Sequence, residues 1–346
     1  MSIVSCKPTI TRKELESVLD CLIRDKLEAG ESVKNFEAQI GNLVSCKYSL
    51  ATSSLTASYH LAFLALDIRP GDEVIVPSFY DPSALGAIQL AGGTPVLVDI
   101  AEGSFAPSVD SIREKITERT RAIIAGHLMG FYSPLDGFKE LNVPLIEDIS
   151  HVIGSEINDR PAGHEGAITV CSFSPSMIIT TGNGGMVMTS NSRFFSAMRD
   201  ARGSGGEGAS PGFDYAMTDF QAAMGYSQLS RLQDFIRRRR DIARVYHDAL
   251  KTTPHKSMYA FNESFVYQSF PIVFDAPSER VEKYWKKTGI ELFRPVPRPL
   301  HLYLNLRPLD FPNSDRLSRK LYSLPIYPTL SKKEIEKIAK TLAKFV

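Results

Sequence analysis

The amino-acid sequence predicts an α/β protein: a large domain with a mostly parallel, doubly wound sheet, and a smaller C-terminal α+β domain. Up to about residue 220, short apolar runs alternate with segments of helical periodicity, which is typical of buried parallel strands joined by helices. Beyond that point, a long helical stretch is followed by strands and helices in mixed order. The length of 346 residues is sufficient for two domains, and we assign residues 1–240 to the large domain and residues 241–346 to the small one.

The individual elements follow from periodicity and from turn sequences. Gly30 ends the first predicted helix, and Gly71-Asp72 and Gly92-Gly93 mark turns, because glycine adopts backbone conformations that other residues disfavour. Between such turns, short apolar runs predict strands and helical periodicity predicts helices. The predicted strands are residues 73–77, 95–100, 121–127, 144–148 and 265–274. The predicted helices are residues 11–29, 33–44, 58–66, 84–91, 220–250, 278–288 and 331–344.

The charge balance excludes two classes of function. Lysine and arginine number 40 against 39 aspartates and glutamates, so we expect neither a broad nucleic-acid surface nor an anionic-membrane surface. Four consecutive arginines, Arg237 to Arg240, lie in the predicted helix over residues 220–250. Because the chain is close to neutral, we interpret this run as the solvated face of a helix.

The cysteines and the N-terminal segment limit the cellular setting. The four cysteines have no Cys-x-x-Cys spacing and no pairing with nearby histidines, so we expect neither a metal site nor a disulfide framework. Residues 1–13 are polar and lack the apolar core of a signal peptide. No stretch approaches the roughly 20 apolar residues of a membrane span. We therefore expect a soluble, cytoplasmic protein.

Six segments carry a family resemblance. They are Gly-Asp-Glu-Val-Ile-Val-Pro-Ser at residues 71–78, Ile-Glu-Asp at 146–148, Ser-Phe-Ser-Pro at 172–175, Thr-Gly-Asn-Gly-Gly at 181–185, Thr-Asp-Phe-Gln-Ala-Ala-Met-Gly at 218–225 and Leu-Pro-Ile-Tyr-Pro at 324–328. In this order they resemble the DegT/StrS sugar aminotransferases, which are pyridoxal-phosphate (PLP) enzymes of aminotransferase fold type I. The resemblance implies a homodimer with a pocket at its interface and a sugar-like substrate. It also implies a role in nucleotide-sugar, polysaccharide or secondary-metabolite biosynthesis.

The resemblance also implies where the catalytic lysine would stand. In the family, the lysine that holds PLP as a Schiff base follows the Ser-Phe-x-Pro segment by two residues, and Met177 occupies that position here. A methionine thioether can neither form an imine nor carry a proton. No lysine occurs between Lys139 and Lys251 to replace it. We therefore interpret the chain as a divergent member that has lost lysine-based transamination.

Two implied phosphate-binding hydroxyls remain, while their surroundings change. The family sequence Ser-Gly-Thr, which closes on the phosphate at a helix N-terminus, is Ser54-Leu55-Thr56 here, with a leucine where close backbone approach is needed. Thr56 and Ser172 keep the implied hydroxyls. Asp214 replaces an asparagine that the family lends across the dimer, and its charge would repel a phosphate.

The pyridine-binding positions are also partly changed. Asp148 matches the carboxylate that pairs with the pyridine nitrogen in the family. An aromatic ring should stack on the pyridine a few residues after Pro77, but Asp81 occupies that position, with Tyr80 one residue earlier. Three residues after Asp148 the family generally has glutamine, whereas this chain has His151.

Three hypotheses for function remain open. In the first, the protein is a PLP-independent enzyme in which His151, Asp148 and Asp81 form an acid–base cluster that acts on a keto-sugar by elimination or isomerisation. In the second, it uses non-covalently bound PLP for amino transfer or dehydration. In the third, it is a non-catalytic partner that completes the site of an active homologue in a heterodimer. We favour the first and therefore expect no cofactor.

Overall fold

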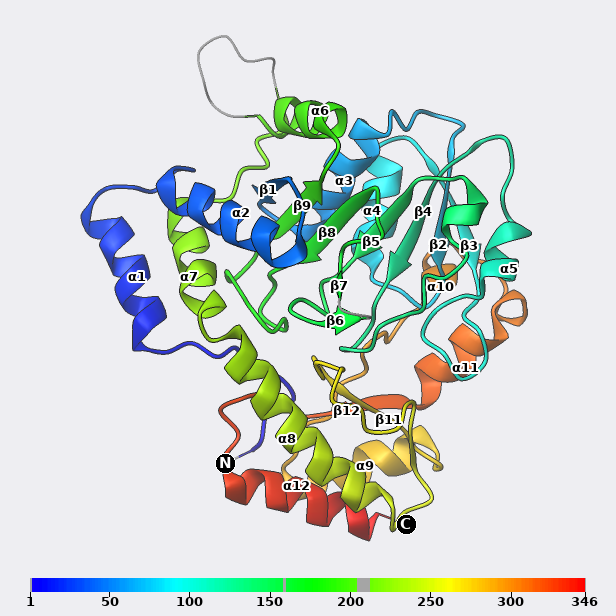
Figure 1. The fold of residues 1–346 in the computed structure, drawn as a ribbon. Coiled ribbons are helices and arrows are strands. Elements are labelled where there is room, and N and C mark those ends of the chain that lie inside the picture. Colours follow the sequence, from blue (N-terminus) through cyan, green and yellow to red (C-terminus); the bar gives the residue numbers. More distant parts are fainter. Residues whose placement is uncertain (1, 158–159, 204–211, 346) are drawn as a thin grey trace.

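The computed structural model describes residues 2–157, 160–203 and 212–345. A seven-stranded sheet with helices on both faces forms the larger part, and a three-stranded sheet with its own helices forms the smaller part, at the lower end of Figure 1. The strand order of the large sheet is β1-β9-β8-β5-β4-β2-β3. Its strands are β1 (Tyr48–Thr52), β2 (Glu73–Pro77), β3 (Thr94–Val98), β4 (Thr120–Gly126), β5 (Leu145–Asp148), β8 (Ile168–Ser172) and β9 (Gly185–Thr189).

The large sheet is mostly parallel. Strands β8, β5, β4, β2 and β3 run in one direction, and only β9 runs antiparallel to its neighbours β8 and β1. The predicted mostly parallel, doubly wound sheet is therefore confirmed. Because parallel strands end at the same edge, the segments that follow β2, β4, β5 and β8 are brought together there.

Alternating side chains of the strands pack against different helical layers. Val74 and Val76 of β2 join a core with α3 and α4, whereas Ile75 between them joins a second core beside α5. Helices α2, α7 and α8 (Leu232–Leu250) pack against Cys171 of β8 and against Met186 and Met188 of β9 in a third core. The helices of this part are α1 (Arg12–Ile23), α2 (Glu31–Val44), α3 (Leu55–Ala65), α4 (Pro82–Leu90), α5 (Val109–Arg113), α6 (Ser192–Arg202) and α7 (Asp219–Leu229).

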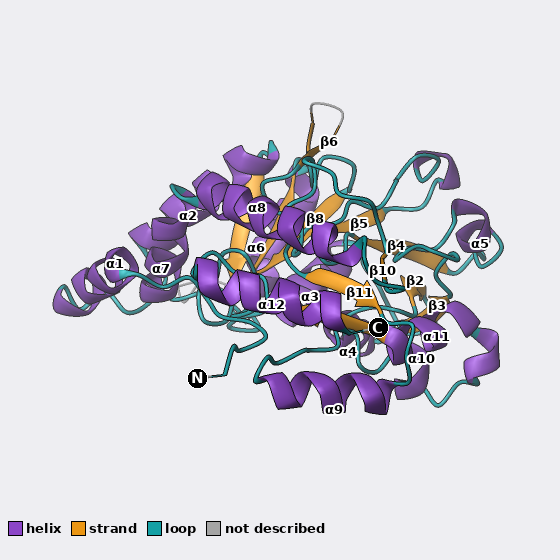
Figure 2. Ribbon diagram, turned by 90° about the horizontal axis from the view of Figure 1, so that it is seen from below, coloured by secondary structure: helices purple, strands orange, loops and turns teal. Residues whose placement is uncertain are grey.

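Helix α8 (Leu232–Leu250) connects the two parts, and α12 packs along it, as Figure 2 shows from below. The N-terminal segment packs on the smaller part, where Ile3 forms a β-bridge with Ile290. The predicted domain boundary after residue 240 lies inside α8, and the division into domains stays a prediction. The remaining elements are β10 (Lys256–Ser257), β11 (Phe270–Val273), β12 (Leu321–Leu324), α9 (Ser278–Thr288), α10 (Leu300–Tyr303), α11 (Pro312–Lys320), α12 (Lys332–Lys344), the short hairpin β6 (Glu156–Ile157) and β7 (Arg160–Pro161), and the 3-10 turns η1 (Lys139–Leu141) and η2 (Pro308–Asp310).

Left-handed residues shorten two of the predicted elements. The helix predicted over residues 11–29 ends at Ile23, because Asp25 adopts a φ of 54° and closes the helix. The strand predicted over residues 265–274 begins only at Phe270, because Tyr267 has a φ of 48°. The helix predicted over residues 220–250 is in fact two helices, α7 and α8, separated at Ser230 and Arg231.

The interpretation of the arginine run, Arg237 to Arg240, as the solvated face of a helix is wrong for part of the run. Arg237 is exposed, but Arg239 is buried and donates to the backbone carbonyls of Tyr267, Gln268 and Ile326. Burial lowers the pKa of the Arg239 guanidinium to about 10. This side chain therefore ties α8 to the loop before β11 and to the segment after β12.

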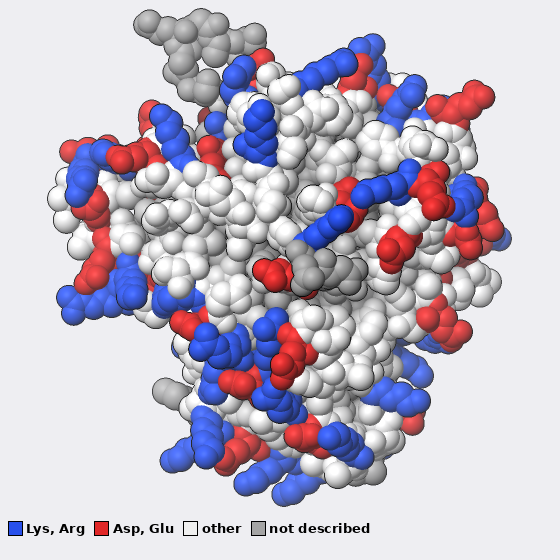
Figure 3. All heavy atoms as spheres, in the orientation of Figure 1, with Lys and Arg blue, Asp and Glu red and all other residues white. Residues whose placement is uncertain are grey.

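The surface in Figure 3 carries both signs of charge interspersed, as the near-zero net charge leads one to expect. No helix among the described residues is long and apolar enough to cross a membrane.

Replacing Arg239 with alanine should destabilise the fold. The substitution leaves three buried carbonyl oxygens without their shared donor, so we expect a loss of about 3 kcal/mol in the free energy of unfolding. Arg237→Ala in the same run is the matched control and should change stability by less than about 0.5 kcal/mol. Equal unfolding midpoints for the two variants in denaturant titrations would show that Arg239 has no structural role.

Candidate active site

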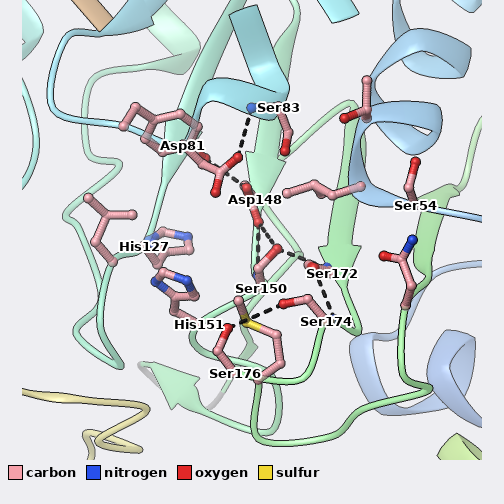
Figure 4. A pocket seen from close by; sticks show the side chains of 16 residues that line it. Ser54, Asp81, Ser83, His127, Asp148, Ser150, His151, Ser172, Ser174 and Ser176 are labelled. Atoms are coloured by element: carbon pink, nitrogen blue, oxygen red, sulfur yellow. Dashed lines mark hydrogen bonds between the residues drawn. The ribbon is translucent and has the colours of Figure 1, made fainter. Parts of the chain in front are cut away.

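A cavity of about 270 Å³ lies at the carboxyl edge of the large sheet. Its wall is built from the segments that follow β1, β2, β4, β5 and β8. Six of the site residues that the sequence singled out line this one cavity: Thr56, Asp81, Asp148, His151, Ser172 and Met177. Figure 4 shows how these segments converge on it.

Asp148, the last residue of β5, is the best-coordinated group in the cavity wall. Its Oδ2 accepts hydrogen bonds from the hydroxyls of Tyr59 (2.7 Å) and Tyr80 (2.8 Å). Its Oδ1 accepts from the backbone N–H (2.8 Å) and the hydroxyl (2.5 Å) of Ser150. A carboxylate has about four lone-pair positions, so these four donors occupy both oxygens.

The two tyrosines are built into the core around this carboxylate. Tyr59 on α3 and Tyr80 after β2 are 0% and 1% exposed, and their hydroxyl oxygens lie 3.0 Å apart. Burial, and then the charge of Asp148, raises the pKa of both phenols well above the usual range, so both keep their protons and donate. The ring of Tyr80 lies directly against the Cα of Gly126, where any side chain would overlap it. Sequence reasoning missed this arrangement, because it compared Tyr80 only with a stacking position.

Asp81 occupies a more open part of the wall. It is the N-cap of α4, and its Oδ1 accepts from the backbone N–H of Ser83 at 2.8 Å. Its side chain is exposed at the cavity edge. Unlike Asp148, it therefore has acceptor capacity available to a bound molecule.

Two histidines, His127 and His151, line the cavity (Figure 4). His151 Nδ1 accepts from the backbone N–H of Met129 at 2.9 Å, and burial lowers the pKa of His151 despite the charges of Asp148 and Asp81. His127 Nδ1 accepts from the N–H of Ser133, and its Nε2 lies 3.0 Å from a carboxylate oxygen of buried Glu147. His127 is therefore fully bound within the protein, whereas His151 has one ring nitrogen left.

Hydroxyl groups and a helix N-terminus also form part of the wall. Ser54 caps α3 by accepting from the N–H of Ala57, and Thr56 lies in the first turn of that helix. Leu55 between them is buried. Ser172, Ser174 and Ser176 follow along the end of β8 and the loop behind it. This wall offers many hydrogen-bonding groups but no lysine or arginine among its described lining residues.

The residues present do not fit covalently bound PLP. Met177 is half-buried in the wall, and no described lining residue carries an amino group that could form an imine. The carboxylate expected to hold a pyridine nitrogen is instead saturated by Tyr59, Tyr80 and Ser150. Asp214 is exposed and does not line the cavity of its own chain. Within the described ranges, no group of three or more His, Cys, Asp or Glu side chains could hold a metal ion.

The tyrosine–carboxylate network should show energetic coupling. We expect Tyr59→Phe and Tyr80→Phe each to cost about 1–3 kcal/mol of stability, because each removes a donor from a buried charge. The double variant should cost at least about 0.5 kcal/mol more than the sum, because Oδ2 then has no donor at all. Chemical unfolding of the four proteins measures this coupling, and strict additivity would contradict a shared network.

Comparison with known proteins supports the family resemblance. Residues 8–343 match the model of the DegT/DnrJ/EryC1/StrS aminotransferase family. The chain is 31% identical to the GDP-perosamine synthase of Escherichia coli O157:H7, over 98% of this chain and 97% of that protein.

Solved structures agree in fold. A putative sugar aminotransferase from Streptococcus pneumoniae, in its PLP form, superposes with a TM-score of 0.92 at 23% identity, covering 99% of this chain and 98% of that one. The aminotransferase TlmJ from Streptoalloteichus hindustanus superposes with a TM-score of 0.91 at 26% identity, covering 99% and 98%. This chain therefore belongs to the DegT/DnrJ/EryC1/StrS aminotransferase family and has the fold-type-I architecture.

Proposed function

We propose that this protein is a non-transaminating member of the sugar aminotransferase family that moves a proton next to the carbonyl group of a keto-sugar, without PLP. The observation that carries the proposal is the internal coordination of Asp148 by three side chains of this chain. With that carboxylate occupied and Met177 in the wall, the cavity offers neither of the two anchors that PLP chemistry requires.

The groups that remain free suit proton transfer. Asp81 has an available carboxylate oxygen at the cavity edge, and His151 has an available ring nitrogen within the same cavity. We assign Asp81 as the group that removes and returns the proton, and His151 as the group that contacts the carbonyl oxygen. Asp148, which the sequence placed in the acid–base cluster, is assigned a structural role because its oxygens are already bound.

The proposed step needs no co-reactant. Asp81 takes a proton from the carbon beside the carbonyl, the C–H electron pair becomes a carbon–carbon double bond, and the carbonyl electrons move to the oxygen. In the resulting enediolate, the proton of the neighbouring hydroxyl moves to the former carbonyl oxygen, and Asp81 returns its proton to the former carbonyl carbon, which gives isomerisation. Return of the proton to the original carbon from the same side regenerates the substrate and exchanges its hydrogen with solvent.

The remaining wall and the family support a sugar as the substrate. Ser54, Thr56, Ser174 and Ser176 also line the cavity, and such hydroxyls pair well with the hydroxyl groups of a sugar. The relative named GDP-perosamine synthase acts in sugar biosynthesis according to its name. The family setting therefore supports a role in making a modified sugar.

Exchange of substrate protons with deuterium oxide tests the proposal. Incubation with keto-sugars in deuterium oxide should replace the hydrogen beside the carbonyl with deuterium. Proton NMR measures the rate at which the signal of that hydrogen disappears. Asp81→Asn should slow this exchange by about 100-fold or more, because the amide still caps α4 but accepts no proton. The control Asp67→Asn, at an exposed carboxylate that does not line the cavity, should leave the rate unchanged.

Two outcomes would contradict the proposal. The first is the absence of exchange with every keto-sugar tested, which would favour the non-catalytic partner hypothesis. The second is an Asp81→Asn variant as active as the wild type, which would remove Asp81 from the reaction.

A further inference from the structure

We propose that His151 is a fixed hydrogen-bond donor toward the substrate carbonyl, not a base, and that the turn Met129–Gly130 imposes this role. The inference rests on the proposed function for its substrate. Its physical basis, however, is the geometry of the free protein.

The backbone of Met129 decides which ring nitrogen of His151 carries the proton. Because the N–H of Met129 points at Nδ1 from 2.9 Å, Nδ1 must present its lone pair. The neutral ring therefore carries its hydrogen on Nε2. That nitrogen has no hydrogen-bond partner among the described residues and is not sealed from the cavity.

A neutral ring in this tautomer cannot accept a proton at Nε2. A second proton would have to enter at Nδ1, directly opposite the N–H of Met129, where two donors would face each other. Burial also lowers the pKa of His151, although the charges of Asp148 and Asp81 act in the opposite sense. Toward a ligand, His151 can therefore only donate, which suits a carbonyl oxygen that gains negative charge during proton removal.

The turn that aims this N–H is held in an unusual backbone conformation. Met129 has a φ of 61° and Gly130 a φ of 92°, so two consecutive residues are left-handed. A Cβ at Gly130 would overlap the backbone nitrogens of Tyr267 and Gln268. The carbonyls of Met129 and Gly130 accept from the N–H groups of Ser269 and Val266, both at 3.2 Å. The segment before β11 therefore clamps the turn that orients His151.

His127 has its tautomer fixed in the same way, but its hydrogen is not available to a ligand. A backbone N–H, from Ser133, also occupies its Nδ1, so its hydrogen also lies on Nε2. That hydrogen is bound by Glu147, however, which leaves His127 nothing to offer a ligand. Of the two histidines in the wall, only His151 thus has a donor available.

The tautomer can be measured on the free protein. In nitrogen-15 NMR of histidine-labelled protein, the His151 resonances, assigned with His151→Gln, should show a protonated Nε2 and an unprotonated Nδ1, as should those of His127. Gly130→Ala should displace the turn and change the His151 pattern while leaving that of His127 in place. A His151 with its hydrogen on Nδ1 would overturn the inference, whatever the exchange assay gives.

A pair of substitutions distinguishes a donor from a base in the exchange reaction. His151→Leu should slow deuterium exchange by about 100- to 1000-fold, as removal of a single oxyanion donor does. His151→Gln should restore a large part of that rate, because its amide N–H donates but takes no proton at neutral pH. Equal loss in both variants would overturn the donor role. Absence of exchange in the wild type, with the tautomer as expected, would instead refute the proposed function.

Discussion

The carboxylate of Asp148, at the end of β5, is the constraint on which the rest of the site depends. It is only 5% exposed, and a buried charge is stable only when its oxygens are hydrogen-bonded. The chain meets this requirement from α3, from the segment after β2 and from Ser150. Those donors fix the floor of the cavity and fill the positions through which a pyridine ring would be held. A solved structure of the same fold has a PLP form, whereas we propose that the cavity of this chain takes no PLP, because these donors occupy the carboxylate.

Around this rigid floor, the remaining groups have separate tasks. Glu147, next to Asp148, faces the other side of β5, where it binds His127 and the N–H groups of Gly163, Glu165 and Gly166. Burial would raise the pKa of Glu147, but these hydrogen bonds outweigh it and lower the pKa. His151 is oriented from the opposite direction, by a turn that the segment before β11 clamps. Contacts between the two parts of the chain therefore reach the cavity through the backbone.

Much of the fold could be predicted from the sequence, because apolar runs and glycine turns are local signals. Strands β1, β8 and β9 were not predicted, since runs such as Ile168–Ser172 mix small polar residues with apolar ones. The family resemblance singled out six residues that the structure brings into one cavity, and their functional roles stay predictions. The roles of Tyr59, Gly126 and Met129 could not be predicted. They depend on contacts between segments distant in sequence. They also depend on the positive φ of Met129, which a methionine in the sequence does not predict.

The most direct test of the account is an absorbance titration of the purified protein with PLP, followed by borohydride reduction and mass analysis. We predict no saturable change in the cofactor spectrum and no reduced adduct, because Asp148 is already bound and Met177 cannot form an imine. A saturable change without an adduct would mean that PLP displaces the tyrosines and binds non-covalently. A trapped adduct would contradict the account outright, because it would require a lysine to enter a cavity whose described wall contains none.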